Sequence, residues 1–125
     1  MSFDVVEAGI AQLRAALERG EVTSRELVEA YLARIAAYDA AGPTLNSVIV
    51  SNPAALDEAR ASDARRAAGE LLGPLDGIPY TAKDSYLVEG LTAASGSPAF
   101  ADLVAQRDAF TIERLRAGGA ICLGL

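Results

Sequence analysis

The sequence predicts an α/β fold in one domain, residues 1–125, made of a helical hairpin (1–44) and the start of an α/β core (45–125). Two observations predict this class. Apolar residues recur at the helical period in the first part of the chain, and short β-branched segments alternate with helical ones in the second. The order strand, helix, strand at the end predicts a mainly parallel sheet joined by a right-handed crossover.

A first helix is predicted over residues 4–19. Gly20 follows it, at a position where helices commonly end in a left-handed residue. The apolar stripe of this helix consists of Val6, Ile10, Leu13 and Leu17.

A second helix is predicted from Thr23 to about Tyr38. The letters TSRE at 23–26 have the form of a capping box, in which Thr23 and Glu26 satisfy each other's backbone N–H groups. A Gly-Pro pair at 42–43 ends the helical hairpin.

The α/β core is predicted to begin with a strand at 45–50, where LNSVIV is β-branched and bounded by turn formers. An Asn-Pro pair at 52–53 predicts the start of a third helix, which runs to Ala68 and stops at Gly69. A buried strand is predicted over 78–83.

The last part of the chain is predicted as a loop, a short helix and a strand. No period emerges from 84 to 106, and a loop of this length in a compact domain suggests a function. Asp108 is expected to cap the helix, and a strand is expected at 120–125. The helix carries two apolar residues and is followed by two glycines: Ile112, Leu115, Gly118 and Gly119.

The final strand reaches Leu125 without a polar turn. A buried strand of a parallel sheet has a neighbour on each side. We therefore expect the polypeptide to continue in its parent protein, with a natural edge strand as the alternative.

Charge and composition exclude several classes of protein. The net charge is −6 and no cationic cluster exceeds Arg65 and Arg66, which argues against nucleic acid and anionic membranes as partners. The N-terminus has no secretory signal and no segment is long and apolar enough to span a membrane, so a cytoplasmic location is expected. Neither a cofactor nor a metal is expected. The single cysteine, Cys122, cannot make an internal disulfide and cannot by itself bind a structural metal.

Histidine is absent from the chain. A Ser-His-Asp triad, a Cys-His dyad and a zinc site built on imidazoles are therefore excluded within these residues. Acid-base chemistry has to use a lysine, a carboxylate, a tyrosine or Cys122.

Lys83 is the only lysine among eleven Lys and Arg residues. Unlike guanidinium, an amine can lose its proton when it is desolvated. Lys83 also stands at the C-terminal end of a predicted strand, where open α/β sheets bind their ligands. From spacing alone, a surface or ion-pair lysine is the alternative to a catalytic one.

The segments GPLDGIPYTAKDSYLVEGLTAASGSPAFAD and DAFTIERLRAGGAICLG resemble the front part of the amidase signature family, and the similarity extends back through GEVTSRELVEAYLARIAAYD. The resemblance implies an incomplete part of that family's α/β/α fold. It also implies hydrolysis of carboxylic amides to acid and ammonia or amine by a lysine, a serine preceded by a cis peptide bond, and a nucleophilic serine. Lys83 matches the family lysine, which burial keeps neutral.

Both family serines lie downstream of the part that this chain matches. We therefore expect an N-terminal fragment that is inactive alone and whose complete enzyme takes a small-molecule amide. One alternative is the corresponding part of an aminoacyl-tRNA amidotransferase subunit. Another is a non-catalytic helical interaction domain, and the first two helices could form a homodimer.

Five other residues have simpler predicted roles. Ser95 and Ser97 are expected to form turns rather than to replace the missing nucleophile. Asp84 is expected to bond to nearby backbone, because successive strand residues point to opposite faces. Asp76 is expected in a turn, and Cys122 is expected to be a small, unreactive core residue.

Overall fold

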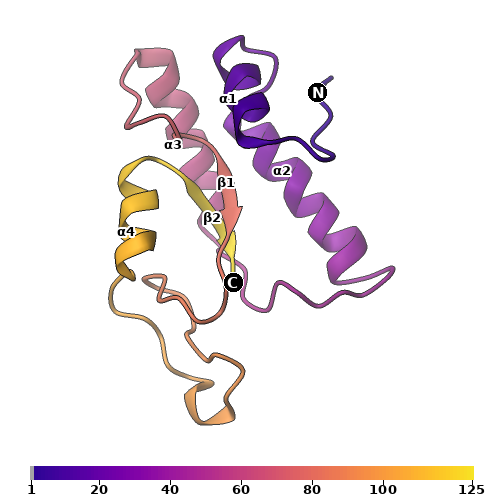
Figure 1. The fold of residues 1–125 in the computed structure, drawn as a ribbon, viewed down its shortest axis with the longest axis vertical. Helices are drawn as coiled ribbons and strands as arrows, with labels where there is room; N and C mark the ends of the chain where they lie inside the picture. Colours follow the sequence, from indigo (N-terminus) through magenta and orange to yellow (C-terminus); the bar gives the residue numbers. More distant parts are fainter. Residues whose placement is uncertain (1) are drawn as a thin grey trace.

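The computed structural model describes residues 2–125, which are built around a short parallel sheet (Figure 1). Strand β1 (Pro79–Thr81) pairs in parallel with β2 (Ile121–Gly124). The other elements are, in chain order, α1 (Ile10–Glu18), α2 (Ser24–Arg34), the π-helical turn η1 (Ile35–Asp39), α3 (Ala55–Ala68), the 3-10 turn η2 (Pro98–Phe100) and α4 (Phe110–Ala117). The α/β class and the parallel pairing are confirmed.

Helices flank the two strands on opposite sides. Figure 1 shows α4 on one flank of the sheet and α1 and α2 on the other. Val28 of α2, Ala59 of α3 and Ile121 of β2 are buried in one apolar cluster. Helices α2 and α3 and strand β2 therefore share a core.

Helix α1 begins at Ile10 and not at residue 4. The Asp4 carboxylate accepts the Val6 N–H at 2.9 Å and the Gln12 side chain accepts the Gly9 N–H at 2.7 Å, so residues before 10 form a turn. Val6 is 52% exposed and does not belong to the apolar stripe. The start predicted for this helix is wrong.

Helix α2 begins as predicted. Thr23 Oγ1 accepts the Glu26 N–H at 3.1 Å, and the Glu26 carboxylate accepts the Thr23 N–H at 2.8 Å, which confirms the capping box. The helix continues through η1, so its end near Tyr38 is also confirmed.

The strand predicted at 45–50 is wrong. Asp39, at the end of η1, accepts the backbone N–H groups of Ser47 at 2.7 Å and Val48 at 3.0 Å. These two donors are therefore not free to join a sheet ladder.

Residues 49–52 instead cross β2 in the antiparallel sense. The Leu125 N–H donates to the Val50 carbonyl at 2.8 Å, and Ser51 forms an isolated bridge with Gly124. Strand β2 consequently has β1 on one side and this crossing on the other.

Helix α3 ends as predicted, with Gly69 in the left-handed region at φ 71°. It starts at Ala55, because Asn52 ties the preceding turn together: its side-chain oxygen accepts the Ala54 N–H at 3.0 Å, and its amide donates to the Cys122 carbonyl at 2.8 Å.

Helix α4 follows a loop that has only the turn η2 and one isolated bridge, between Thr92 and Val104. The predicted cap by Asp108 is wrong. Its carboxylate accepts the Glu89 N–H at 2.8 Å and pairs with Arg116 at 2.6 Å, so it fastens the loop to α4 and leaves the N-cap position to Ala109.

Asp76 lies in the predicted turn and also forms a buried ion pair that the sequence did not predict. Asp76 is only 1% exposed. Its carboxylate accepts two hydrogen bonds from Arg65 at 2.8 Å and one from Ser62 at 2.7 Å. The Leu72 N–H donates a further bond at 2.9 Å. This pair joins α3 to the turn that leads into β1.

Candidate active site

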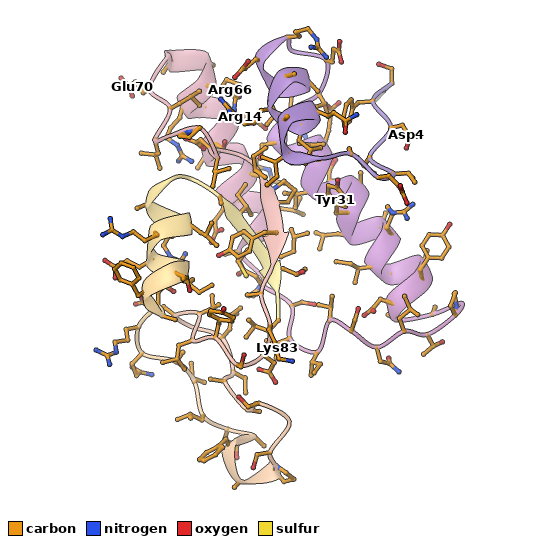
Figure 2. All side chains as sticks on the ribbon, in the orientation of Figure 1. Asp4, Arg14, Tyr31, Arg66, Glu70 and Lys83 are labelled. Atoms are coloured by element: carbon orange, nitrogen blue, oxygen red, sulfur yellow. The ribbon has the colours of Figure 1, made fainter. Side chains whose placement is uncertain are left out.

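Lys83 lies two residues beyond β1, at the carboxyl end of the sheet (Figure 2). The ladder ends earlier than the predicted residue 83, with a last bond from the Ala82 N–H to the Gly124 carbonyl at 3.0 Å. The Tyr86 N–H donates to the Lys83 carbonyl at 2.9 Å, so the chain turns here.

The Lys83 side chain is exposed, and it forms no ion pair with any other of residues 2–125. The burial implied for the family lysine is therefore not supplied by the part of the chain that the structure describes.

A hollow of about 350 Å³ opens beside Lys83. Three segments that are distant in sequence form its walls: residues 82–85, residues 95–96, and Ser47 with Ile49. Leu125 completes it from the end of β2. The hollow thus lies at the carboxyl ends of both strands, where parallel sheets place ligands.

Asp39 fixes one wall of this hollow. The Ser47 hydroxyl and the Ser47 and Val48 N–H groups all donate to its carboxylate. The bond from the Ser47 hydroxyl, and then those from the Val48 and Ser47 backbone, lower the pKa of Asp39 below its usual value. Nothing in the sequence around Asp39 predicted this role, because its partners lie beyond a Gly-Pro turn.

Ser95 fixes the opposite wall. Its backbone is left-handed at φ 49°, and its hydroxyl donates to the Asp84 carbonyl at 2.8 Å. The Ser95 hydroxyl is thus bonded to a backbone carbonyl and not to the Lys83 amine. This agrees with the prediction that Ser95 is a turn residue.

One oxygen of the Asp84 carboxylate lacks the predicted bond to nearby backbone. Its Oδ1 atom is buried and has no hydrogen-bond partner among residues 2–125. Buried carboxylate oxygens are normally bonded. The expected bond to nearby backbone is therefore not made by this oxygen, which stands at the hollow as an unused acceptor.

Cys122 is buried in β2, with its thiol 3.6 Å from the Gly124 carbonyl. Burial raises the pKa of this thiol, so it stays protonated and unreactive at neutral pH. The prediction of a small core residue agrees with this position.

Residues 2–125 bring together no group of His, Cys, Asp or Glu side chains of the kind that holds a metal ion. None of the helices in the same range has both the length and the hydropathy needed to cross a bilayer. The chemistry that these residues do offer is an amine at the mouth of a hollow, with serine hydroxyls and one free carboxylate oxygen around it.

Comparison with known proteins gives the site a context. Residues 26–125 match the family model described as Amidase. The chain is 46% identical over 116 residues to a glutamyl-tRNA(Gln) amidotransferase subunit of Methylococcus capsulatus, covering 92% of this chain and 23% of that protein.

Solved structures agree with the sequence relatives. A peptide amidase in complex with the competitive inhibitor chymostatin superposes with a TM-score of 0.93 at 43% identity, covering 98% of this chain and 25% of that one. The native peptide amidase of Stenotrophomonas maltophilia gives a TM-score of 0.90 at 43% identity, covering 94% of this chain and 24% of that one. The chain thus spans about a quarter of the length of the proteins it matches.

Proposed function

This chain belongs to the amidase family, and we propose that it is the N-terminal part of a hydrolase that cleaves carboxylic amides to an acid and ammonia or an amine. The observation that supports this most is the place of Lys83. Its amine stands at the carboxyl ends of β1 and β2, beside a hollow of about 350 Å³.

In the proposed reaction Lys83 is the general base. A serine preceded by a cis peptide bond relays to the Lys83 amine the proton of a nucleophilic serine, which attacks the amide carbonyl. The carbon–nitrogen bond then breaks, the protonated amine leaves, and water hydrolyses the acyl-enzyme to the acid. Neither serine is assigned to a residue of this chain, so residues 1–125 alone are proposed to be inactive.

The first test is an assay of the 125-residue chain on simple aliphatic and aromatic amides. We expect no turnover above buffer. Hydrolysis that disappears in a Lys83→Ala variant would refute the proposal that the catalytic set is incomplete.

The second test assigns the role of Lys83. Residues 1–125 are fused to the Stenotrophomonas maltophilia peptide amidase in place of its matching first quarter, and hydrolysis of peptide amides is measured. We expect Lys83→Arg to lower kcat by about 10²–10⁴-fold, the typical contribution of a positioned general base. Arg14→Ala is the matched control, because Arg14 is an exposed cation at the other end of the molecule (Figure 2). Retained activity in Lys83→Arg would overturn the assignment.

The corresponding part of an aminoacyl-tRNA amidotransferase is the second candidate, supported by the 46% identity to a protein of that name. This function would require further subunits, whereas an amidase would not. An activity of the fused enzyme that depends on an added amidotransferase partner would favour the second candidate.

A non-catalytic interaction domain is the third candidate, with a homodimer formed through the first two helices. The exposed side chain of Ile10 (58%), the first residue of α1, supports it. Sedimentation of the 125-residue chain distinguishes this candidate, because a dimer that Ile10→Asp dissociates is expected only if these helices self-associate.

A further inference from the structure

Two serines line the hollow beside Lys83 from opposite walls, Ser47 on one and Ser95 on the other. Ser47 donates its hydroxyl hydrogen to the Asp39 carboxylate, and Ser95 donates its own to the Asp84 carbonyl at 2.8 Å. The bond from the Ser47 hydroxyl is the largest cause that lowers the pKa of Asp39, so this carboxylate is ionised at neutral pH. An ionised carboxylate and a carbonyl can only accept hydrogen bonds. Neither serine hydroxyl therefore donates into the hollow while these bonds are in place.

The two serine oxygens keep their capacity to accept. A serine hydroxyl has two lone pairs in addition to its one hydrogen. Because the hydrogens of Ser47 and Ser95 are already donated to other groups, the oxygens present only lone pairs to a molecule in the hollow. The hollow thus offers an acceptor on each of two walls, and the Lys83 amine beside them carries N–H donors.

The backbone holds both serines in place. The Ser47 N–H donates to Asp39 at 2.7 Å and the Ile49 N–H donates to the Leu125 carbonyl at 2.6 Å, so this wall is fixed at both ends. Ser95 is left-handed at φ 49°. A residue other than glycine in this region costs energy, and such residues cluster at active sites and at sites that clamp a ligand. The acceptors are therefore preorganised, which lowers the cost of binding.

We infer that Ser47 and Ser95 are specificity-determining residues that accept the N–H groups of the bound amide, and that Asp39 is the positioning residue that keeps Ser47 an acceptor. The inference rests on the proposed function and names its substrate class, amides with an unsubstituted nitrogen. Such an amide has two N–H donors for the two serine oxygens and a carbonyl that accepts from the Lys83 amine. An amide with a fully substituted nitrogen has no N–H and leaves both serine oxygens without a donor, which weakens its binding.

The test compares butanamide with N,N-dimethylbutanamide, which has the same acyl chain but no N–H group. Binding of each compound to the 125-residue chain is measured by NMR titration. Lys83 is the sole lysine, so its side-chain signal reports on the hollow without overlap. We expect butanamide to shift the signals of Ser47, Ser95 and Lys83 saturably. It should bind at least about fivefold more tightly than the dimethyl compound, the loss that corresponds to about one hydrogen bond.

Four variants assign the contact, each compared with wild type by its amide spectrum to show that it is folded. Ser47→Ala and Ser95→Ala should each weaken butanamide binding about two- to tenfold and leave binding of the dimethyl compound unchanged. Ser47→Thr keeps the hydroxyl and should restore the affinity. Asp39→Asn should lower the preference for butanamide, because its side chain brings N–H donors next to the Ser47 oxygen.

Ser97→Ala is the matched control for the two alanine variants. Ser97 does not line the hollow, and its side chain does not cap η2. The affinity for butanamide should change less than twofold in this variant.

The outcomes separate the inference from the proposed function. No saturable shift with butanamide, equal binding of the two compounds, or equal effects of Ser47→Ala and Ser97→Ala would each overturn the inference. The expected preference in binding, together with a fused enzyme that hydrolyses no amide, would leave the acceptor site in place and overturn the proposed function. Hydrolysis by the fused enzyme without this preference in binding would have the reverse consequence.

Discussion

Replacing Asp76 with alanine tests whether the buried ion pair with Arg65 holds α3 against the turn that leads into β1. The Asp76 side chain is fully buried, whereas that of Arg65 is 27% exposed. Breaking a buried pair by removing one partner costs about 3–5 kcal/mol. Because Arg65 can still reach water, we expect the lower end, a loss of about 3 kcal/mol in the free energy of unfolding.

The assay is urea and thermal unfolding followed by circular dichroism. A loss of this size should lower Tm by roughly 10 °C or more in a chain of this length. Asp57→Ala is the matched control, because Asp57 pairs with Arg60 at 2.7 Å but is 81% exposed, and it should cost less than about 0.5 kcal/mol. Equal losses in the two variants would refute the argument from burial.

The pH dependence gives an independent check on the same pair. Burial acts to raise the pKa of Asp76, but the bonds from Arg65, Leu72 and Ser62 outweigh it and hold this pKa below its usual value. A lowered folded-state pKa stabilises the fold above the unfolded pKa of about 3.9, and this contribution is lost as the pH falls through the folded-state value. The difference between wild type and Asp76→Ala should therefore be constant from about pH 5 to 8 and shrink below about pH 4. A difference that grows in acid would contradict the assignment.

Three further predictions concern single residues. Gly119→Ala should destabilise the fold by at least ~1 kcal/mol more than Gly90→Ala. Both glycines have φ 85°, but only at Gly119 would the new Cβ clash, at 2.5 Å from the Asp76 side chain. Equal losses of unfolding free energy in urea would contradict this reason. Thr23→Ala should cost about 1 kcal/mol by removing the cap of α2, and Thr23→Ser should restore most of it in the same assay. Cys122 should react slowly with an aromatic disulfide reagent at pH 8 and rapidly in denaturing urea, because burial raises the pKa of its thiol; fast labelling of the folded chain would show that β2 is accessible.

Local signals predicted the parts of the fold that depend on adjacent residues. The capping box at Thr23 and the stop at Gly69 each involve groups a few residues apart, and both were confirmed. The prediction of a strand at 45–50 was wrong because the backbone N–H groups of Ser47 and Val48 donate to the Asp39 carboxylate. These bonds depend on where η1 ends, which the local sequence does not reveal.

The candidate site was predictable in position but not in surroundings. The sole lysine at the end of a predicted buried strand indicated an amine at a sheet end, and Lys83 lies there. The walls of its hollow come from segments that meet only in the folded chain, so periodicity gave no sign of Ser47 or Ser95 beside it. The family resemblance supplied the chemical role, which residue spacing alone left open.

The crossing of residues 49–52 over β2 has a consequence for how the chain acquires its structure. The Asn52 side chain donates a hydrogen bond to the carbonyl of Cys122, which lies in β2, 70 residues away. Strand β2 is also the only sheet partner of β1 within residues 2–125. Contacts of such long sequence separation form slowly, because the intervening loop must close first. On the ribosome, β1 and the crossing residues therefore cannot complete their backbone pairing until β2 has emerged.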